Sequence, residues 1–395
     1  MHRHTHIGKR MAGLAALALL MALTACNRRP LEVFYPETVS VRLCVAWYEG
    51  SPYDEYLKAE GKPLSNFGTS RSDLPNGMTV LLAKNGEKVT QTNITNDVEE
   101  YNLSLAPGTY YMMLFNNTTS EYSNMLFQNM SDFVKAQATV GTTTRSTRVW
   151  DDSVSYLNTA EKIGVAVDTL VITEEMLKSQ LSFTSYENRN DLPAVPEEKI
   201  FKYYESVQLM TTTLTVRVKV RGIENMQSVV GNIDGMAEGF YLSQVWRTEN
   251  SGTQYLSGWK VEYDDKGNAY IVISVPTMGL PHGKEFESQR DSTDNVLKLH
   301  FTLKDGTTID YTYNVGKYIH YTDDNGGDIE GTVLKPADVT LELLLELDAP
   351  LVPEETLPEL PDVTPVTPDD PGTKTGGFDA EVAPWEDGGT VDIGL

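Results

Sequence analysis

Apolar and polar residues alternate with a period of two in many short segments between residues 39 and 347. The clearest example is the segment 214–220, where four aliphatic residues alternate with threonine, arginine and lysine. This pattern is typical of β-strands that bury one face and expose the other. A similar pattern in the segment 39–47 predicts a strand with Val39, Val41, Leu43, Val45 and Trp47 on one face.

Turn signals separate these segments at regular intervals. Asn85-Gly86 and Asp305-Gly306 suit two-residue hairpin turns, which need positive φ. The segments 101–105 and 110–115 flank a proline-glycine pair, and we expect them to form a hairpin as well. Helical patterns are few and short; one begins after Thr173, a residue suited to cap a helix N-terminus.

The fold class that follows is all-β and not a parallel sheet, because the long helical crossovers needed between parallel strands are missing. We expect two tandem Greek-key β-sandwich domains, with partly closed barrels as the alternative. Prolines and charges interrupt the alternation near residue 198, which suggests a domain boundary there. The expected division is an export signal at 1–25, a tether at 26–36, domains at 37–198 and 199–348, a linker at 349–376 and a C-terminal strand segment at 377–395.

The linker is rich in proline, threonine and acidic residues, so we expect it to be extended and poorly packed. After it, Phe378, Ala380 and Val382 alternate with acids and form a candidate donor strand. An apolar strand beyond such a linker needs an edge to pair with. That edge could belong to this chain or to a neighbour.

The N-terminus carries three basic residues followed by an apolar run, as in secretory signals. The run ends in Leu23, Thr24, Ala25 and Cys26, which resemble a bacterial lipobox. The resemblance implies that a signal peptidase recognises the first three and that Cys26 is acylated. Alternatives are a membrane helix and a signal cleaved to leave a free thiol. We favour lipidation, so we expect an outer membrane lipoprotein that is displayed on the cell surface.

Net charge is −24 at pH 7. Loss of the signal removes three cations and makes the remaining chain more acidic, so nucleic acid is excluded as a partner. Only Cys44 remains after lipidation, which allows no intramolecular disulfide. The thiol lies within a predicted strand and far in sequence from histidine, so we interpret it as inert.

The sequence has no phosphate-binding loop, nucleophile elbow or paired-carboxylate motif, so we expect neither an enzyme nor a cofactor. Asp323, Asp324 and Asp328 on a glycine-rich turn could bind calcium, but they lack the spacing of an EF-hand. A solvated turn is the preferred interpretation. His300 and His320 lie near acids without a third ligand pattern, so no metal site is predicted.

Several segments resemble the fimbrillins and related surface lipoproteins of Bacteroides. They are the lipobox, Val45-Ala46-Trp47, the segment 105–110, the glycine-punctuated segment 230–237 and the ending 377–382 with Trp385. The resemblance implies two transthyretin-like β-sandwich domains in a fimbrial subunit, anchor or tip protein. It also implies that an arginine-specific protease removes the first strand and that a partner subunit's terminal strand fills the groove.

Under this resemblance Arg71, in the loop after the first strand, is the candidate processing site. Arg145 and Arg148 are less suitable, because a cut there would remove several strands. All three could also be ordinary solvated arginines. A second hypothesis for function is a glycan-binding lipoprotein of a polysaccharide-capture system that engages host or glycan ligands. Trp246, Trp259 and Tyr318 would then stack on sugar rings.

Overall fold

The computed structural model describes residues 37–84, 87–143, 155–180, 195–322, 327–329, 342–349 and 356–365. This part of the chain is all-β, as predicted. The helical segments are short: α2 (Asp54–Ala59), α3 (Glu174–Gln180), η1 (Arg71–Asp73), η3 (Glu197–Lys199), η4 (Ile223–Asn225), η5 (Glu287–Gln289) and η6 (Ser292–Asp294). None of the helices in these ranges has the length and apolar character needed to cross a membrane.

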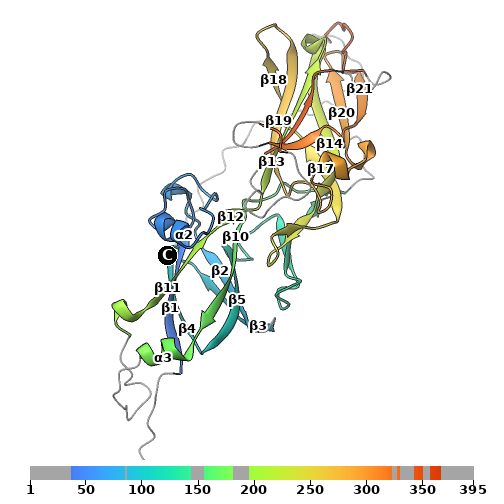
Figure 1. The fold of residues 1–395 in the computed structure, drawn as a ribbon. Helices are drawn as coiled ribbons and strands as arrows, with labels where there is room; N and C mark the ends of the chain where they lie inside the picture. The colour runs from blue at the N-terminus through green and yellow to red at the C-terminus, as the bar shows by residue number, and fades with distance from the viewer. Residues whose placement is uncertain are drawn as a thin grey trace, which may run out of the picture.

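Two sheets enclose one hydrophobic core in the lower half of Figure 1. The three-stranded sheet has the order β11 (Phe201–Ser206), β1 (Val39–Ala46) and β4 (Glu100–Leu105). The five-stranded sheet has the order β12 (Gln208–Leu209), β10 (Gly164–Ile172), β5 (Gly108–Asn116), β2 (Met78–Lys84) and β3 (Glu87–Ile94). The first strand of the chain is therefore the middle strand of the smaller sheet.

Two further sheets form the upper half of Figure 1. The first has the order β18 (Lys260–Tyr263), β19 (Ala269–Thr277), β13 (Thr212–Val220), β23 (Glu342–Leu347) and β22 (Ile319–Thr322). The second has the order β21 (Thr308–Asn314), β20 (Val296–Leu303), β14 (Met226–Ala237), β17 (Ser251–Leu256), β9 (Tyr156–Leu157) and β8 (Thr142–Thr143). Alternate residues of β13 are buried along its whole length, as its sequence predicts.

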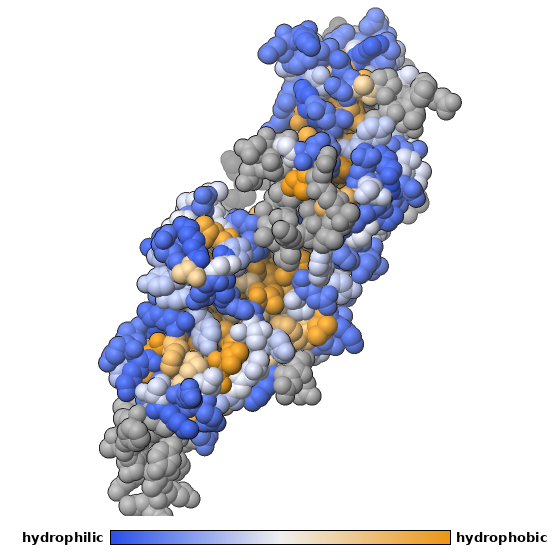
Figure 2. Space-filling model, in the orientation of Figure 1, coloured by the Kyte–Doolittle hydropathy of each residue, from blue (hydrophilic) through white to orange (hydrophobic). Residues whose placement is uncertain are grey.

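A fifth sheet joins strands from the two halves of the chain. Its order is β16 (Trp246–Arg247), β15 (Gly239–Tyr241), β7 (Gln137–Val140) and β6 (Met125–Gln128). Figure 2 shows mainly hydrophilic residues over the upper end of the visible face and groups of apolar residues in its middle and lower parts. The exposed large hydrophobic side chains include Tyr111, Leu126 and Val134.

The strands do not separate at residue 198, where a domain boundary was expected. Strands β11 and β12 follow that point, yet β11 pairs with β1 and β12 pairs with β10. Prolines and charges locate a break in the strand pattern, but pairing between distant segments decides which sheet the next strand joins.

The hairpin predicted for the segments 101–105 and 110–115 is wrong. Strand β4 pairs with β1, whereas β5 pairs with β2 and β10 in the other sheet. The chain crosses from one sheet to the other at Pro107, which has no amide hydrogen to donate. The hairpins β2–β3 and β20–β21 are confirmed, and Gly306 has the positive φ that the second turn needs.

Part of the expected linker is packed against the upper sheets. Leu360 is buried, and its amide donates to the carbonyl of Arg221 at 2.9 Å. The hydroxyls of Tyr311 and Tyr313 donate to carbonyls of the same segment. Residues 356–365 are therefore packed against the upper core and are not a poorly packed spacer. Leu360 belongs to that core, and Leu357 and Val363 pack against it.

Candidate functional site

Strand β1 fills the middle of its sheet. It pairs in parallel with β11 from Val41 to Ala46 and antiparallel with β4 from Val39 to Cys44. The side chains of Val39, Val41, Leu43 and Val45 have no exposed surface, and neither has Trp47 just beyond the strand. Trp47 also donates from Nε1 to the carbonyl of Val98 at 2.8 Å. This agrees with the face that the period-two pattern predicts.

The burial of β1 stabilises the fold strongly. Each fully buried aliphatic side chain contributes about 1.5–3 kcal/mol relative to exposure. The four aliphatic residues on its inner face therefore contribute on the order of 10 kcal/mol. The strand also satisfies backbone groups of β4 and β11, which would otherwise lack hydrogen-bond partners on the sides that face it. Its place must stay filled for the sandwich to remain intact.

The other face of β1 holds Cys44, whose side chain is also buried. Burial raises the pKa of this thiol to about 11, so it is protonated at neutral pH. Because the thiolate is the reactive form, the thiol is held in an unreactive state.

Arg71 lies in an exposed turn between β1 and β2. Residues 69–72 are all exposed, and the Arg71 side chain retains 74% of its accessible surface. The turn is organised by Asp73, whose carboxylate accepts from the amides of Thr69 and Ser70 at 2.8 and 3.0 Å. These hydrogen bonds lower the pKa of Asp73. Arg71 is the single arginine in the sequence between β1 and β2.

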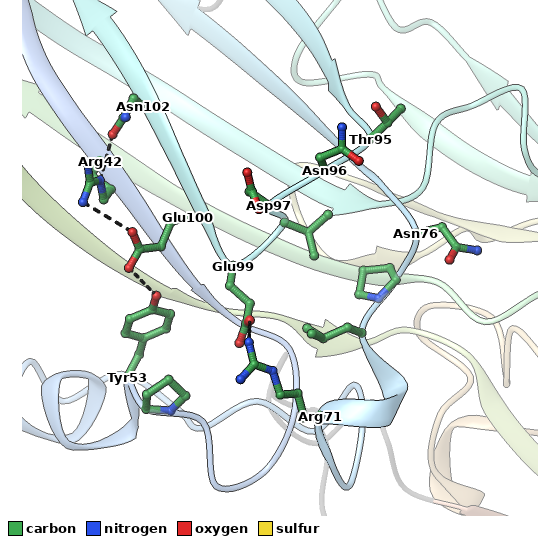
Figure 3. Close-up of a pocket in the computed structure, with 14 residues that line it drawn as sticks. Arg42, Tyr53, Arg71, Asn76, Thr95, Asn96, Asp97, Glu99, Glu100 and Asn102 are labelled. Atoms are coloured by element: carbon green, nitrogen blue, oxygen red, sulfur yellow. Dashed lines mark hydrogen bonds and ion pairs between the residues drawn. The ribbon is translucent and has the colours of Figure 1, made fainter.

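Arg71 borders a polar cavity of about 670 Å³ (Figure 3). Its guanidinium donates from Nη2 to Oε2 of Glu99 at 2.8 Å. Tyr53 and Glu100 also line this cavity, and the Tyr53 hydroxyl donates to Oε1 of Glu100 at 2.8 Å. Burial and this hydrogen bond raise the pKa of Tyr53.

Arg42 projects from β1 at the far side of the same cavity. Its Nε donates to Oδ1 of Asn102 at 2.8 Å and its Nη2 to Oε2 of Glu197 at 2.9 Å. The Nη1 atom of Arg42 also lies 3.4 Å from Oε2 of Glu100. The hydrogen bond to Glu197 raises the pKa of Arg42. One side chain of β1 thus connects β4 to the turn that precedes β11.

Lys62 makes a second connection, on the other side of β11. Its Nζ donates to Oδ2 of Asp168 at 2.6 Å, to Oε1 of Glu205 at 2.9 Å and to the carbonyl of Tyr204 at 2.8 Å. Burial raises the pKa of Glu205 to about 8. Burial by itself would raise the pKa of Asp168, but hydrogen bonds from Glu205 and Lys62 outweigh it and lower the pKa. At neutral pH the proton therefore stays on Glu205 and the charge on Asp168.

The sequence singled out Arg71 but neither Arg42 nor Lys62. The sequence pattern could have indicated Arg42, because it is the one cation on the polar face of the predicted strand 39–47, whose other face holds five apolar residues. Lys62 gave no such signal, because the loop that carries it is brought to β10 and β11 by tertiary packing alone.

Several predicted site residues lie outside the described ranges. They are the lipobox residues Leu23, Thr24, Ala25 and Cys26, the arginines Arg145 and Arg148, the strand residues Phe378, Ala380 and Val382, and the acids Asp323 and Asp324. Asp328 is described, and its Oδ1 lies 2.9 Å from Nε2 of His320. Within the described ranges, no three histidine, cysteine or acidic side chains are grouped so as to hold a metal ion.

The aromatic residues of the glycan hypothesis are all partly buried. Trp246 packs against His282, with ring centroids 4.7 Å apart. Trp259 packs against the upper core and donates from Nε1 to the carbonyl of Leu256 at 3.3 Å. Tyr318 packs against the same core. Each of the three therefore keeps part of its surface exposed, and glycan stacking by these residues stays a prediction.

Comparison with known families matches a segment around this site. Residues 67–257 match the family described as a domain of unknown function (DUF5119). The DUF5119 segment includes β4 and β11, the two neighbours of β1, but not β1 itself. It covers slightly less than half of the chain. The sequence matches no curated protein.

The chain is also similar to several solved structures. A candidate adhesin from Bacteroides ovatus is 16% identical, with a TM-score of 0.46, over 83% of this chain and 98% of that one. A candidate polysaccharide-binding protein from Bacteroides thetaiotaomicron is 10% identical, with a TM-score of 0.41, over 77% and 88%. The fimbrial anchor protein Mfa2 from Porphyromonas gingivalis is 11% identical, with a TM-score of 0.37, over 70% and 82%.

Proposed function

We propose that the protein is a lipid-anchored, non-enzymatic subunit of a cell-surface fimbria or adhesive fibre. In this proposal a cut after Arg71 frees β1, and a strand from a partner subunit takes its place. The observation that carries the proposal is the central position of β1 between β4 and β11, followed by a single exposed arginine before β2.

A cut after Arg71 would separate residues up to 71 from the rest of the chain. This part contains β1 and α2 together with Trp47, Leu57 and Phe67, all of which are buried. Neighbouring strands lie about 4.8 Å apart, so β4 and β11 would be left about 10 Å apart, which is the width of one missing strand. The remaining edges and the apolar floor provide a site for strand addition.

The burial of β1 also explains why exchange would need a partner. Loss of the strand alone would expose the apolar core and leave backbone groups unpaired, so the cut chain would keep β1 until another strand replaced it. The candidate donor strand around Phe378, Ala380 and Val382 would serve the same purpose in a neighbouring subunit. Acylated Cys26 would hold the uncut protein at the outer membrane.

The test is the N-terminus and oligomeric state of protein released from native membranes, compared with a variant that lacks residues 376–395. A new N-terminus at Ser72 in assembled material is the expected result. Polymers that disappear in the shortened variant would support donation by the terminal segment. Assembled protein that retains an acylated Cys26 would contradict the exchange of β1.

A further inference from the structure

Within the described ranges, the ion pairs between residues 37–71 and later residues have one polarity. Arg42 pairs with Glu100 and Glu197, Lys62 with Asp168 and Arg71 with Glu99, so in each of these pairs the cation lies on the segment and the carboxylate on the later part. From this asymmetry we infer that the strand replacing β1 comes from a different protein with a basic donor segment. It does not come from a second copy of this chain. The inference rests on the proposed exchange of β1.

Arg42 is the part of this pattern that lies on β1 itself. It occupies a position on the outer face of the strand, between Val41 and Leu43, and contacts Glu100 and Glu197 from there. Removal of β1 would leave these two carboxylates on either side of the vacant position. Lys202, the residue of β11 directly opposite Arg42, stays with the remaining chain, and its Nζ lies 3.9 Å from Oε1 of Glu197.

Two more cations lie in the loop that leaves with β1. Arg71 pairs with Glu99, and Lys62 pairs with Asp168. Glu205 does not add to the charge, because it holds its proton at neutral pH. Removal of the segment would thus leave Glu99, Asp168 and the two partners of Arg42 without their present cations. A strand that approaches this site meets a surface of negative potential.

The terminal segment of this chain has the wrong charge for such a surface. Residues 377–395 contain five acidic residues and neither lysine nor arginine. If Phe378, Ala380 and Val382 covered the apolar floor, the intervening Asp379 and Glu381 would take outer positions equivalent to that of Arg42. An acidic side chain at the position of Cys44 would lie directly opposite Glu100 on β4, and like charges on adjacent strands are destabilising. One at the position of Arg42 would lie near Glu197 as well as beside Lys202.

The suitable donor therefore has apolar residues at alternate positions and a lysine or arginine between them. A subunit that accepts only such a strand does not polymerise with itself. It instead joins fibre components of different kinds, as a component at one end of an assembly would.

The experiment uses protein that begins at Asn27 and carries a site-specific protease sequence at Arg71. After cleavage, labelled peptides compete with the released segment. One peptide copies residues 37–48, one copies 377–388, and one copies 377–388 with Asp379→Lys and Glu381→Lys. A matched control carries Glu386→Lys and Asp387→Lys, which change the charge equally but lie beyond the alternating residues.

We expect the 37–48 peptide and the peptide with Asp379→Lys and Glu381→Lys to bind. The unaltered tail and the matched control should bind at least about tenfold more weakly, which corresponds to about 1.4 kcal/mol. The difference should shrink in high salt, because exposed charges are screened. Arg42→Glu in the 37–48 peptide should weaken binding, and Arg42→Lys should restore most of it.

Equal binding of the unaltered tail and its Asp379→Lys, Glu381→Lys variant would overturn the inference while leaving strand exchange intact. Failure of even the 37–48 peptide to bind would overturn strand exchange itself and the inference with it. The two failures are distinguished by the behaviour of the 37–48 peptide.

Discussion

The Nζ of Lys62 lies 2.9 Å from Oε1 of Glu205, a contact between the loop that follows β1 and the strand β11 that flanks it. Glu205 is almost fully buried, so it keeps a proton that an exposed glutamate would lose. Lys62 and Glu205 thus link the N-terminal segment to the sheet beside the proposed exchange site, and they give that link a dependence on pH.

The first prediction concerns this pH dependence. The pKa of Glu205 is about 8 in the folded protein, against an ordinary value of 4.5. Between these values the folded chain holds a proton that the unfolded chain releases, so the free energy of unfolding falls as pH rises. Each pH unit between these two values should lower the free energy of unfolding by about 1.4 kcal/mol, and the loss should level off above pH 8.

Glu205→Gln should remove this loss, because glutamine is neutral and can still donate to Asp168. Urea unfolding at pH 6 and pH 9 measures the effect. The wild type should lose more stability than the variant between these two values. Glu262→Gln on the exposed strand β18 serves as the control and should behave like the wild type. Parallel profiles for the wild type and Glu205→Gln would show that Glu205 does not titrate in this range.

The second prediction concerns processing at Arg71. Arg71→Lys and Arg71→Ala should both prevent the cut if the protease requires arginine, and the N-terminus of cell-surface protein should then remain at Cys26. Arg221→Lys is the matched control, because that side chain is 72% exposed and Arg71 is 74% exposed. A new N-terminus at Ser72 in Arg71→Ala protein would exclude an arginine-specific cut. Mass spectrometry of the released protein identifies the N-terminus of each variant.

The third prediction concerns the strength with which β1 is held. Leu43 has no exposed surface, so Leu43→Ala should lower the free energy of unfolding by about 2–5 kcal/mol. Val261→Ala, at a side chain that is 40% exposed, should change it by no more than about 0.5 kcal/mol. Urea titration compares the two. A similar small loss in both variants would show that β1 contributes little to the core.

The fourth prediction uses Cys44 as a reporter of β1. In protein that begins at Asn27, Cys44 is the remaining cysteine of the sequence. Its raised pKa and burial should make alkylation slow at pH 8. After cleavage at Arg71 and addition of a competing strand, alkylation should become fast, because the released segment exposes the thiol. Fast alkylation of uncut native protein would contradict the burial of β1. Urea-unfolded protein gives the reference rate.

The local pattern of the sequence was enough to predict much of the fold. Alternation predicted the all-β class, the inner face of β1 and the burial of β13, because a strand with one buried face must repeat every two residues. Capping chemistry predicted the start of α3, where Thr173 accepts from the amide of Met176 at 3.1 Å. Each of these features depends on residues close together in the chain.

The tertiary structure decided which strands are neighbours. Nothing near Phe201 in the sequence indicates that β11 returns to pair with β1, and the proline before β5 looked like a hairpin turn although it connects two sheets. Tertiary packing likewise places Lys62 beside Asp168 and Arg42 beside Glu197. Local patterns determine whether a segment is a strand and which face is apolar. The choice of partner strand depends on the sum of many long-range contacts, so the position of β1 between β4 and β11 emerges only from the folded chain.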